Sequence, residues 1–154
     1  MTDLKDLQSR LAELSPELYP IFSEEFGDTV IAVEHPRLLE TATRLKELGF
    51  DRLGFVTAID RQESFVLVYR LTSRSLSAAV FVKTSVPRDD AHIPSLFDVW
   101  PAANWQEREV YDMFGILFDG HPDLRRMLLP EDWVGHPLRK DYQDDRIIRR
   151  PDYI

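Results

Sequence analysis

Cysteine is absent from this 154-residue chain, and its six glycines are all singly placed. Without a thiol the chain cannot form a disulfide, a cysteine-ligated iron–sulfur cluster, a zinc–thiolate site or a cysteine nucleophile. No Gly-x-Gly-x-x-Gly run, phosphate-binding loop or Gly-x-Ser-x-Gly turn occurs either. The sequence therefore lacks the signatures of the common nucleotide-binding, serine hydrolase and cluster-binding classes.

The chain also lacks a surplus of positive charge and a long apolar run. Its net charge is −8, from 27 acidic and 19 basic residues. Nucleic acids and anionic membranes attract positive fields, so we expect neither to be a direct ligand. No stretch approaches the ~20 apolar residues of a membrane span, and the acids near the start are unlike a signal peptide. We expect a cytoplasmic protein that meets a membrane only indirectly, through a partner.

Hydrophobic periodicity predicts two helices and five short strands before residue 87. Apolar residues three and four apart predict helices over 3–14 and over 35–48. Alternating or continuous apolar runs joined by short turns predict strands. A strand pair is expected within 18–26 and 29–33, followed by an antiparallel meander of Leu53–Asp60, Ser64–Leu71 and Ser77–Thr84. This pattern predicts an α+β fold, a mixed or antiparallel sheet with helices packed on it.

The last third of the chain has a different character. We expect residues 87–103 to form a loop with a short helical turn at 95–100. A helix over 104–114 follows, with Asn104 as its N-cap and Glu107 reaching back to it. Half of the ten prolines lie at or after Pro101, and periodicity ends near Phe118, which indicates an extended irregular C-terminal arm. We divide the single domain into a compact body over 1–103 and a helix with a docking arm over 104–154.

The helix over 104–114 carries a dense set of charged residues. Its apolar side contains Val110 and Phe114, while Arg108, Tyr111 and Asp112 share another side. That charged side is either solvated, with ordinary ion pairs that contribute little, or buried against another protein, where such pairs give register and specificity. The residues alone leave both interpretations open.

Two turns of the arm echo each other, Gly120-His121-Pro122 and Gly135-His136-Pro137, each followed by a leucine and an arginine. The simplest interpretation is a pair of turns that present cations. An enzyme with a metal or acid–base site built from His121, His136 and Asp112 is the alternative, although no His-x-x-x-His or Glu-x-x-His pair supports it. Arginines and aromatic residues are enriched in the arm, as at protein interfaces.

The residues from Glu107 to Ile116 read Glu-Arg-Glu-Val-Tyr-Asp-Met-Phe-Gly-Ile. This run resembles the signature of the bacterial NADH-quinone oxidoreductase subunit that is designated C, the counterpart of the thirty-kilodalton (30 kDa) subunit of mitochondrial complex I. The similarity continues through 120–126, 129–133 and 135–142 and covers roughly residues 98–142. One departure is Gln143, which stands where the family usually has a proline after Asp-Tyr.

The resemblance implies assembly rather than chemistry. It implies a non-catalytic peripheral-arm subunit of the proton-translocating NADH:quinone oxidoreductase, which scaffolds electron transfer from NADH to quinone. The implied partners are the hydrogenase-like large subunit (designated D) and the iron–sulfur subunits B and I, at the cytoplasmic face of the cell membrane. FMN and the iron–sulfur clusters would lie in other subunits, with no catalytic, cofactor-binding or metal-binding residue in this chain.

The same resemblance places the partner interface on the helix and the arm. The expected contact residues are Glu107, Arg108, Glu109, Tyr111, Asp112, His121, Arg125, Arg126, Trp133, His136, Arg139, Lys140, Asp141 and Tyr142. The alternatives are an equivalent subunit of a membrane-bound hydrogenase or of a ferredoxin- or F-type dehydrogenase, a stand-alone metal-dependent enzyme, and a chaperone-like binder used only during assembly.

Overall fold

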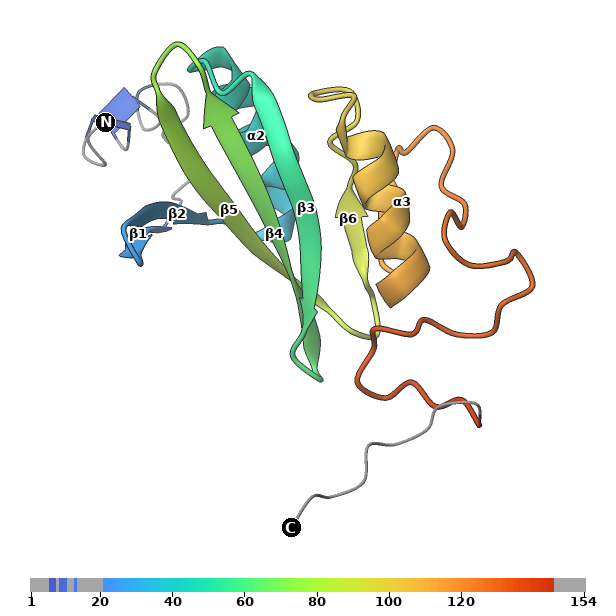
Figure 1. Ribbon diagram of the computed structural model, residues 1–154. Helices are drawn as coiled ribbons and strands as arrows, with labels where there is room; N and C mark the ends of the chain where they lie inside the picture. The colour runs from blue at the N-terminus through green and yellow to red at the C-terminus, as the bar shows by residue number, and fades with distance from the viewer. Residues whose placement is uncertain (1–5, 8, 11–12, 14–20, 146–154) are drawn as a thin grey trace.

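A computed structural model describes residues 6, 7, 9, 10, 13 and 21–145 of the chain. Its main sheet has five strands in the order β1-β2-β5-β4-β3 (Figure 1). These strands are β1 (Ile21–Glu25), β2 (Asp28–Ala32), β3 (Arg52–Asp60), β4 (Ser64–Ser73) and β5 (Ala78–Pro87). β3, β4 and β5 form the predicted antiparallel meander, while β2 pairs parallel to β5. The sheet is therefore mixed, and the predicted α+β class is confirmed.

The helix predicted over 35–48 begins with a short 3-10 turn, η1 (His35–Arg37), and continues as α2 (Leu38–Glu47). Pro36 fits the first turn because its fixed φ suits a helix start and its missing N–H has no partner there. α2 lies behind the sheet in Figure 1, with Leu38 and Leu45 buried. Of the helix predicted over 3–14, the described residues 6, 7, 9, 10 and 13 are helical, and the others lie outside the described part.

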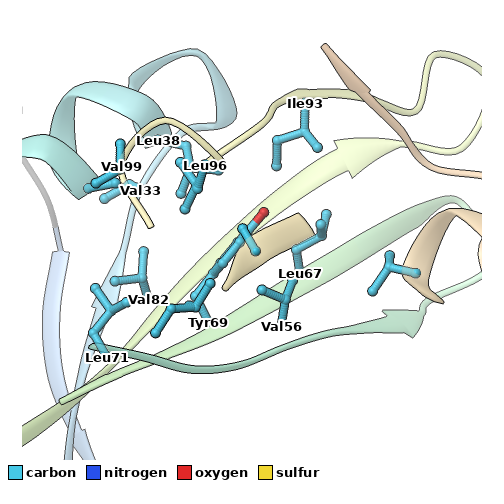
Figure 2. Close-up of a cluster of buried hydrophobic side chains, with 14 of the residues drawn as sticks. Val33, Leu38, Val56, Leu67, Tyr69, Leu71, Val82, Ile93, Leu96 and Val99 are labelled. Carbon is cyan, nitrogen blue, oxygen red and sulfur yellow. The ribbon is translucent and has the colours of Figure 1, made fainter. Parts of the chain in front are cut away.

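The core lies between the inner face of the sheet and the helices. Alternation along β4 points Phe65, Leu67, Tyr69 and Leu71 inward, and all four are buried. Figure 2 shows Tyr69 and Leu67 among side chains from the neighbouring strands, below residues of α2 and of the segment after β5. Burying each large apolar side chain contributes roughly 1.5–3 kcal/mol to folding.

The segment that follows the sheet corrects two predictions. Residues 92–94 were expected in a loop but form β6 (His92–Pro94). β6 pairs parallel to β7 (Leu117–Asp119), and a helix lies between the two strands in the sequence. That helix, α3 (Ala103–Phe114), begins one residue early and has no side-chain N-cap. The predicted capping box is wrong because the Glu107 carboxylate turns away from the helix start, toward Ser95 and Leu96.

Beyond β7, residues 120–145 contain no helix or strand, as the periodicity predicted. Figure 1 shows this arm, in orange to red, running past α3 and then toward the lower end of the sheet. None of the helices in the described ranges is long and apolar enough to cross a membrane. The division into a body over 1–103 and an arm over 104–154 stays a prediction.

Candidate protein interface

The arm completes the C-terminal end of α3. The last four carbonyls of an α-helix have no partner inside the helix, so they must be satisfied from outside. Gly115 adopts a left-handed conformation, with φ of 73°, and its N–H closes the helix on Tyr111. The next three carbonyls accept from the arm: Asp112 from His136 and Arg126, Met113 from the Leu138 N–H, and Phe114 from Arg139. The helix end and the arm are therefore one hydrogen-bonded unit.

The Asp112 side chain holds the first half of the arm. One carboxylate oxygen accepts the backbone N–H groups of Met127, Leu128 and Leu129 at 3.0, 2.7 and 3.0 Å. The other oxygen accepts Arg126 Nη1 at 2.8 Å. Burial alone would raise the pKa of Asp112, but these hydrogen bonds together lower it below its ordinary value. Asp112 is therefore a buried anion that orders four consecutive residues of the arm.

Arg126 and His136 join the arm to itself and to α3. Arg126 Nη2 donates to the carbonyls of Trp133 and Gly135 at 3.0 and 2.9 Å. His136 Nδ1 donates to the Asp112 carbonyl at 2.9 Å. Burial lowers the pKa of His136, and its single donated bond agrees with a neutral ring. The positive charge of Arg126 also favours its place beside the negative end of the helix.

A second anchor lies at the far end of the arm. Asp60, buried at the end of β3, pairs with Arg88 and accepts the Lys140 N–H at 2.8 Å. Burial would raise the pKa of Asp60, but Arg88 and two backbone N–H groups lower it to about 2. The guanidinium carbons of Arg88 and Arg139 lie 4.9 and 5.2 Å from the centre of the buried Phe65 ring. The arm is thus attached to the sheet as well as to α3.

The other end of α3 is held in a similar way. His121 Nε2 donates to the Asn104 carbonyl at 3.1 Å, and its Nδ1 accepts the Asp123 N–H. Arg108 donates to the carbonyls of Arg125 and Arg126, both at 3.2 Å, and lies over the Trp105 ring. The two Gly-His-Pro turns thus fasten the arm at opposite ends of one helix, a role that their sequence echo did not reveal.

Glu107 is buried on the side of α3 that faces the body. Its carboxylate accepts the Ser95 hydroxyl at 2.5 Å and the Leu96 N–H at 2.7 Å. Burial raises the pKa of Glu107 to about 7, with these two bonds acting against the rise. The hydroxyl of Tyr69 is buried without a hydrogen-bond partner in the described part of the chain, and burial and the nearby Glu107 raise its pKa well above the ordinary value. Glu107 therefore titrates near neutral pH inside the fold.

The predicted interface residues separate into three groups, which are buried, exposed and half-buried. Glu107, Arg108 and Asp112 are buried inside their own chain, so the expectation that they face solvent or a partner is corrected. Glu109, Arg125, Lys140 and Asp141 are exposed. The remaining ones, Tyr111, His121, Arg126, Trp133, His136, Arg139 and Tyr142, are half-buried. For these two sets, contact with a partner stays a prediction.

Three exposed apolar residues of the arm were missed by sequence reasoning. Leu128, Val134 and Leu138 keep 60%, 85% and 55% of their surface exposed. Their backbones lie in segments fixed by Asp112, Arg126 and α3, so the side chains are displayed on an ordered support. The charge pattern pointed to the arginines instead, and no periodicity marks exposed apolar residues on an irregular segment.

The structure does not bring together the metal site considered as an alternative, which would consist of His121, His136 and Asp112. The described ranges contain no group of three or more His, Asp or Glu side chains placed to hold a metal ion. Both ring nitrogens of His121 and the Nδ1 of His136 bond to backbone groups, and the two rings lie at opposite ends of α3. The alternative of a stand-alone enzyme built from His121, His136 and Asp112 therefore loses the proximity that it required.

These observations define a class of protein: an α+β body that holds an irregular arm in place with buried charges and displays apolar side chains on it. Residues 31–146 match the family described as respiratory-chain NADH dehydrogenase, 30 Kd subunit. The chain therefore belongs to this family.

Related proteins agree with that assignment. NADH-quinone oxidoreductase subunit 5 of a Thermus thermophilus strain is 40% identical over 148 residues, with 88% of this chain and 72% of that protein covered. The NADH-quinone oxidoreductase subunit designated C in Moorella thermoacetica is 45% identical over 131 residues, covering 82% of this chain and 88% of that protein.

Solved structures show the same fold. The trypsin-resistant fragment (1-134) of Nqo5 aligns with a TM-score of 0.67 and 32% identity over 78% of this chain and 97% of the fragment. A chain of the membrane-bound sulfane sulfur reductase, an archaeal respiratory membrane complex, aligns with a TM-score of 0.81 and 26% identity over 97% of this chain and 98% of that one. The second match extends over nearly the whole chain, arm included.

Proposed function

We propose that this chain is a scaffolding subunit in the peripheral arm of an NADH:quinone oxidoreductase, where it binds neighbouring subunits through α3 and the arm. Family membership supports the assembly, and the ordered arm supports the mode of attachment. An irregular segment with 26 described residues after β7 would normally lose its order without a partner, because fixing each residue costs roughly 1–2 kcal/mol. Here the buried Asp112 and Asp60 hold it in place before any partner arrives.

Preorganisation favours binding because the ordering cost is met during folding rather than on association. The exposed apolar trio of Leu128, Val134 and Leu138 would supply apolar contact, and the exposed Arg125 and Lys140 would supply polar contacts. The proposed partners are the hydrogenase-like large subunit (designated D) and the iron–sulfur subunits B and I. Those subunits and their neighbours would hold the flavin and the clusters, at the cytoplasmic face of the membrane.

A pair of substitutions in this apolar trio tests this function. Val134→Asp with Leu138→Asp places two charges on the exposed side chains and leaves the backbone hydrogen bonds of the arm in place. We expect the tagged variant to fold but to be recovered with less than about a tenth of the wild-type amount of partner subunits, since an unpaired interface charge costs about 2–5 kcal/mol. Phe26→Asp, at an exposed apolar residue in the β1–β2 turn, is the matched control and should assemble normally.

Recovery of the double variant at wild-type stoichiometry would contradict this role for the apolar trio. The composition of the purified mature complex distinguishes a scaffolding subunit from a chaperone-like binder. A binder used only during assembly would be missing from that complex.

The match to the archaeal respiratory complex favours one second candidate, the equivalent subunit of a related membrane-bound complex with another electron donor. Both candidates use the same arm, so the arm variants do not separate them. The content of the purified assembly does, because an NADH enzyme contains an FMN-bearing NADH-oxidising subunit. An assembly that lacks FMN and NADH oxidation would favour the second candidate.

A further inference from the structure

The sheet has a second face, which is formed by the outward-pointing residues of β2 to β5. α2 lies behind the sheet in Figure 1, α3 contacts β3, and no described helix covers the front of β3, β4 and β5. Val30 and Val68 are buried but lie outside the main core cluster, so they belong to this outer face. The outer face is thus a separate surface from α3 and the arm.

The outer face is apolar along its centre. Phe55, Arg70 and Phe81 are opposite one another on β3, β4 and β5, and the two rings lie 6.1 Å apart. Ile59 pairs with Val66 further along the same strands. Phe55 and Ile59 keep 37% and 40% of their surface exposed. Aromatic and aliphatic side chains displayed together on a sheet are typical of a contact surface.

On β3, β4 and β5, the charge on this face has the opposite sign to that of the chain, and β2 adds one acid, Asp28, at its start. β3, β4 and β5 contain one acidic residue, Asp60, which lies on the inner side and binds Arg88. Their outward cations are Arg52, Arg70 and Lys83, and only Lys83 has a partner, Glu25 at 2.6 Å. Within the part of the chain described, the side chains of Arg52 and Arg70 form no ion pair and no hydrogen bond.

Arg70 has room beside the aromatic pair because its neighbour on β3 is a glycine. A Cβ atom placed on Gly54 would lie 3.2 Å from the Arg70 carbonyl oxygen and 3.6 Å from Nη1. The ladder between β3 and β4 is irregular at the same point, between Leu53 and Phe55. The half-buried Arg70 side chain therefore lies against Gly54, and it has no counter-ion in the described ranges.

We propose that the outer face binds a protein helix that presents carboxylates beside apolar side chains. A guanidinium donates two parallel hydrogen bonds to a carboxylate, and arginine with aromatic residues is typical of interface hot spots. Arg70 would pair with the acid, and Phe55 and Phe81 would pack against the apolar side chains of the helix. A nucleic acid is the less favoured occupant, because the chain carries a net charge of −8 and would repel a phosphate backbone.

A photocrosslinking group at Thr57 tests the proposal. Thr57 is exposed on the outer face, directly opposite Val68. Thr57→p-benzoylphenylalanine is expressed in the full chain, irradiated in intact cells, and analysed by mass spectrometry. We expect one crosslinked protein peptide with Asp or Glu among apolar residues at helical spacing. The crosslink forms in the cell, before membranes are solubilised. It is therefore detected even if the arm does not hold the chain in a complex during purification.

Charge variants show whether the crosslink depends on Arg70. We expect Arg70→Glu to lower the crosslink yield about tenfold. If this charge reversal impairs folding, the neutral variant Arg70→Gln takes its place, and we expect it to lower the yield at least threefold. Arg74→Glu, in the exposed turn between β4 and β5, is the control and should change the yield less than twofold. No crosslinked protein, a crosslink to nucleic acid, a peptide without acids, or yields unaffected by both Arg70 variants would each overturn the proposal.

Discussion

Replacing Asp112 by asparagine should release the first half of the arm from α3. The substitution keeps the size and one acceptor oxygen but removes the negative charge that Arg126 and three backbone N–H groups share. The other contacts of this segment include the hydrogen bonds of Arg126 to the carbonyls of Trp133 and Gly135, and the side chain of Arg126 is itself held by Asp112. We therefore expect local detachment of this segment, while the sheet stays folded.

The free-energy cost of Asp112→Asn follows from the number of hydrogen bonds that the carboxylate accepts and from their burial. A hydrogen bond to a charged group contributes roughly 1.5–3 kcal/mol, and breaking a buried ion pair by removing one partner costs about 3–5 kcal/mol. Asp112 is fully buried, so solvent does not screen these interactions. Since asparagine retains part of the hydrogen bonding, we expect a loss of about 3 kcal/mol for local opening.

Amide hydrogen exchange measures that opening residue by residue. Each 1.4 kcal/mol is a factor of ten, so the amides of Met127, Leu128 and Leu129 should exchange about a hundredfold faster in the variant. Amides of β4 should not change. Asp123→Asn is the control, because Asp123 is an exposed carboxylate that pairs with the exposed Arg125. Unchanged exchange at 127–129 in Asp112→Asn would refute the view that this carboxylate orders the arm.

Three further predictions concern the buried carboxylates and one glycine. The pKa of Glu107 is raised from 4.5 to about 7, so its stabilisation is present below pH 4.5 and lost as pH rises through 7. Urea unfolding of the wild type should lose about 3 kcal/mol across that range, and Glu107→Gln should remove this dependence. The pKa of Asp60 is lowered from 3.8 to about 2, so its stabilisation is present above pH 3.8 and lost as pH falls. The stability difference between wild type and Asp60→Asn should be about 2 kcal/mol at pH 5 and should shrink toward pH 2. In Gly115→Ala, the added Cβ would lie 2.6 Å from the His136 ring, whereas Gly120 has a similar φ and open space around it. Thermal unfolding should therefore show Gly115→Ala to be less stable than Gly120→Ala by about 1–3 kcal/mol.

The local sequence pattern was sufficient to predict the strands of the meander in the body of the protein. The alternation of Phe65, Leu67, Tyr69 and Leu71 predicted the buried face of β4, and short turns predicted the meander, because both are properties of neighbouring residues. The parallel pairing of β2 with β5 could not be predicted in the same way. It joins segments about fifty residues apart in sequence, and no turn links them.

The contacts between α3 and the arm were not predicted from the sequence, and contact of either with a partner stays a prediction. The spacing of Arg108 and Asp112 suggested an outward charged face, since the helix period does not reveal which face the later chain will cover. Asp112 binds backbone N–H groups, which every residue except proline has, so the identity of residues 127–129 carried no signal for it. Glu107 fitted a capping box by spacing, but a loop earlier in the chain supplied its partners.

Purification of the tagged chain from gently solubilised membranes tests the proposed scaffolding role most directly. The number of copies of this chain per FMN, together with the subunits that accompany it, measures whether it is a stoichiometric part of an NADH-oxidising assembly. We expect one copy of the chain per FMN, with a large hydrogenase-like subunit and iron–sulfur subunits in the same particle. Recovery of the chain alone, from membranes that retain the intact enzyme without it, would contradict that role.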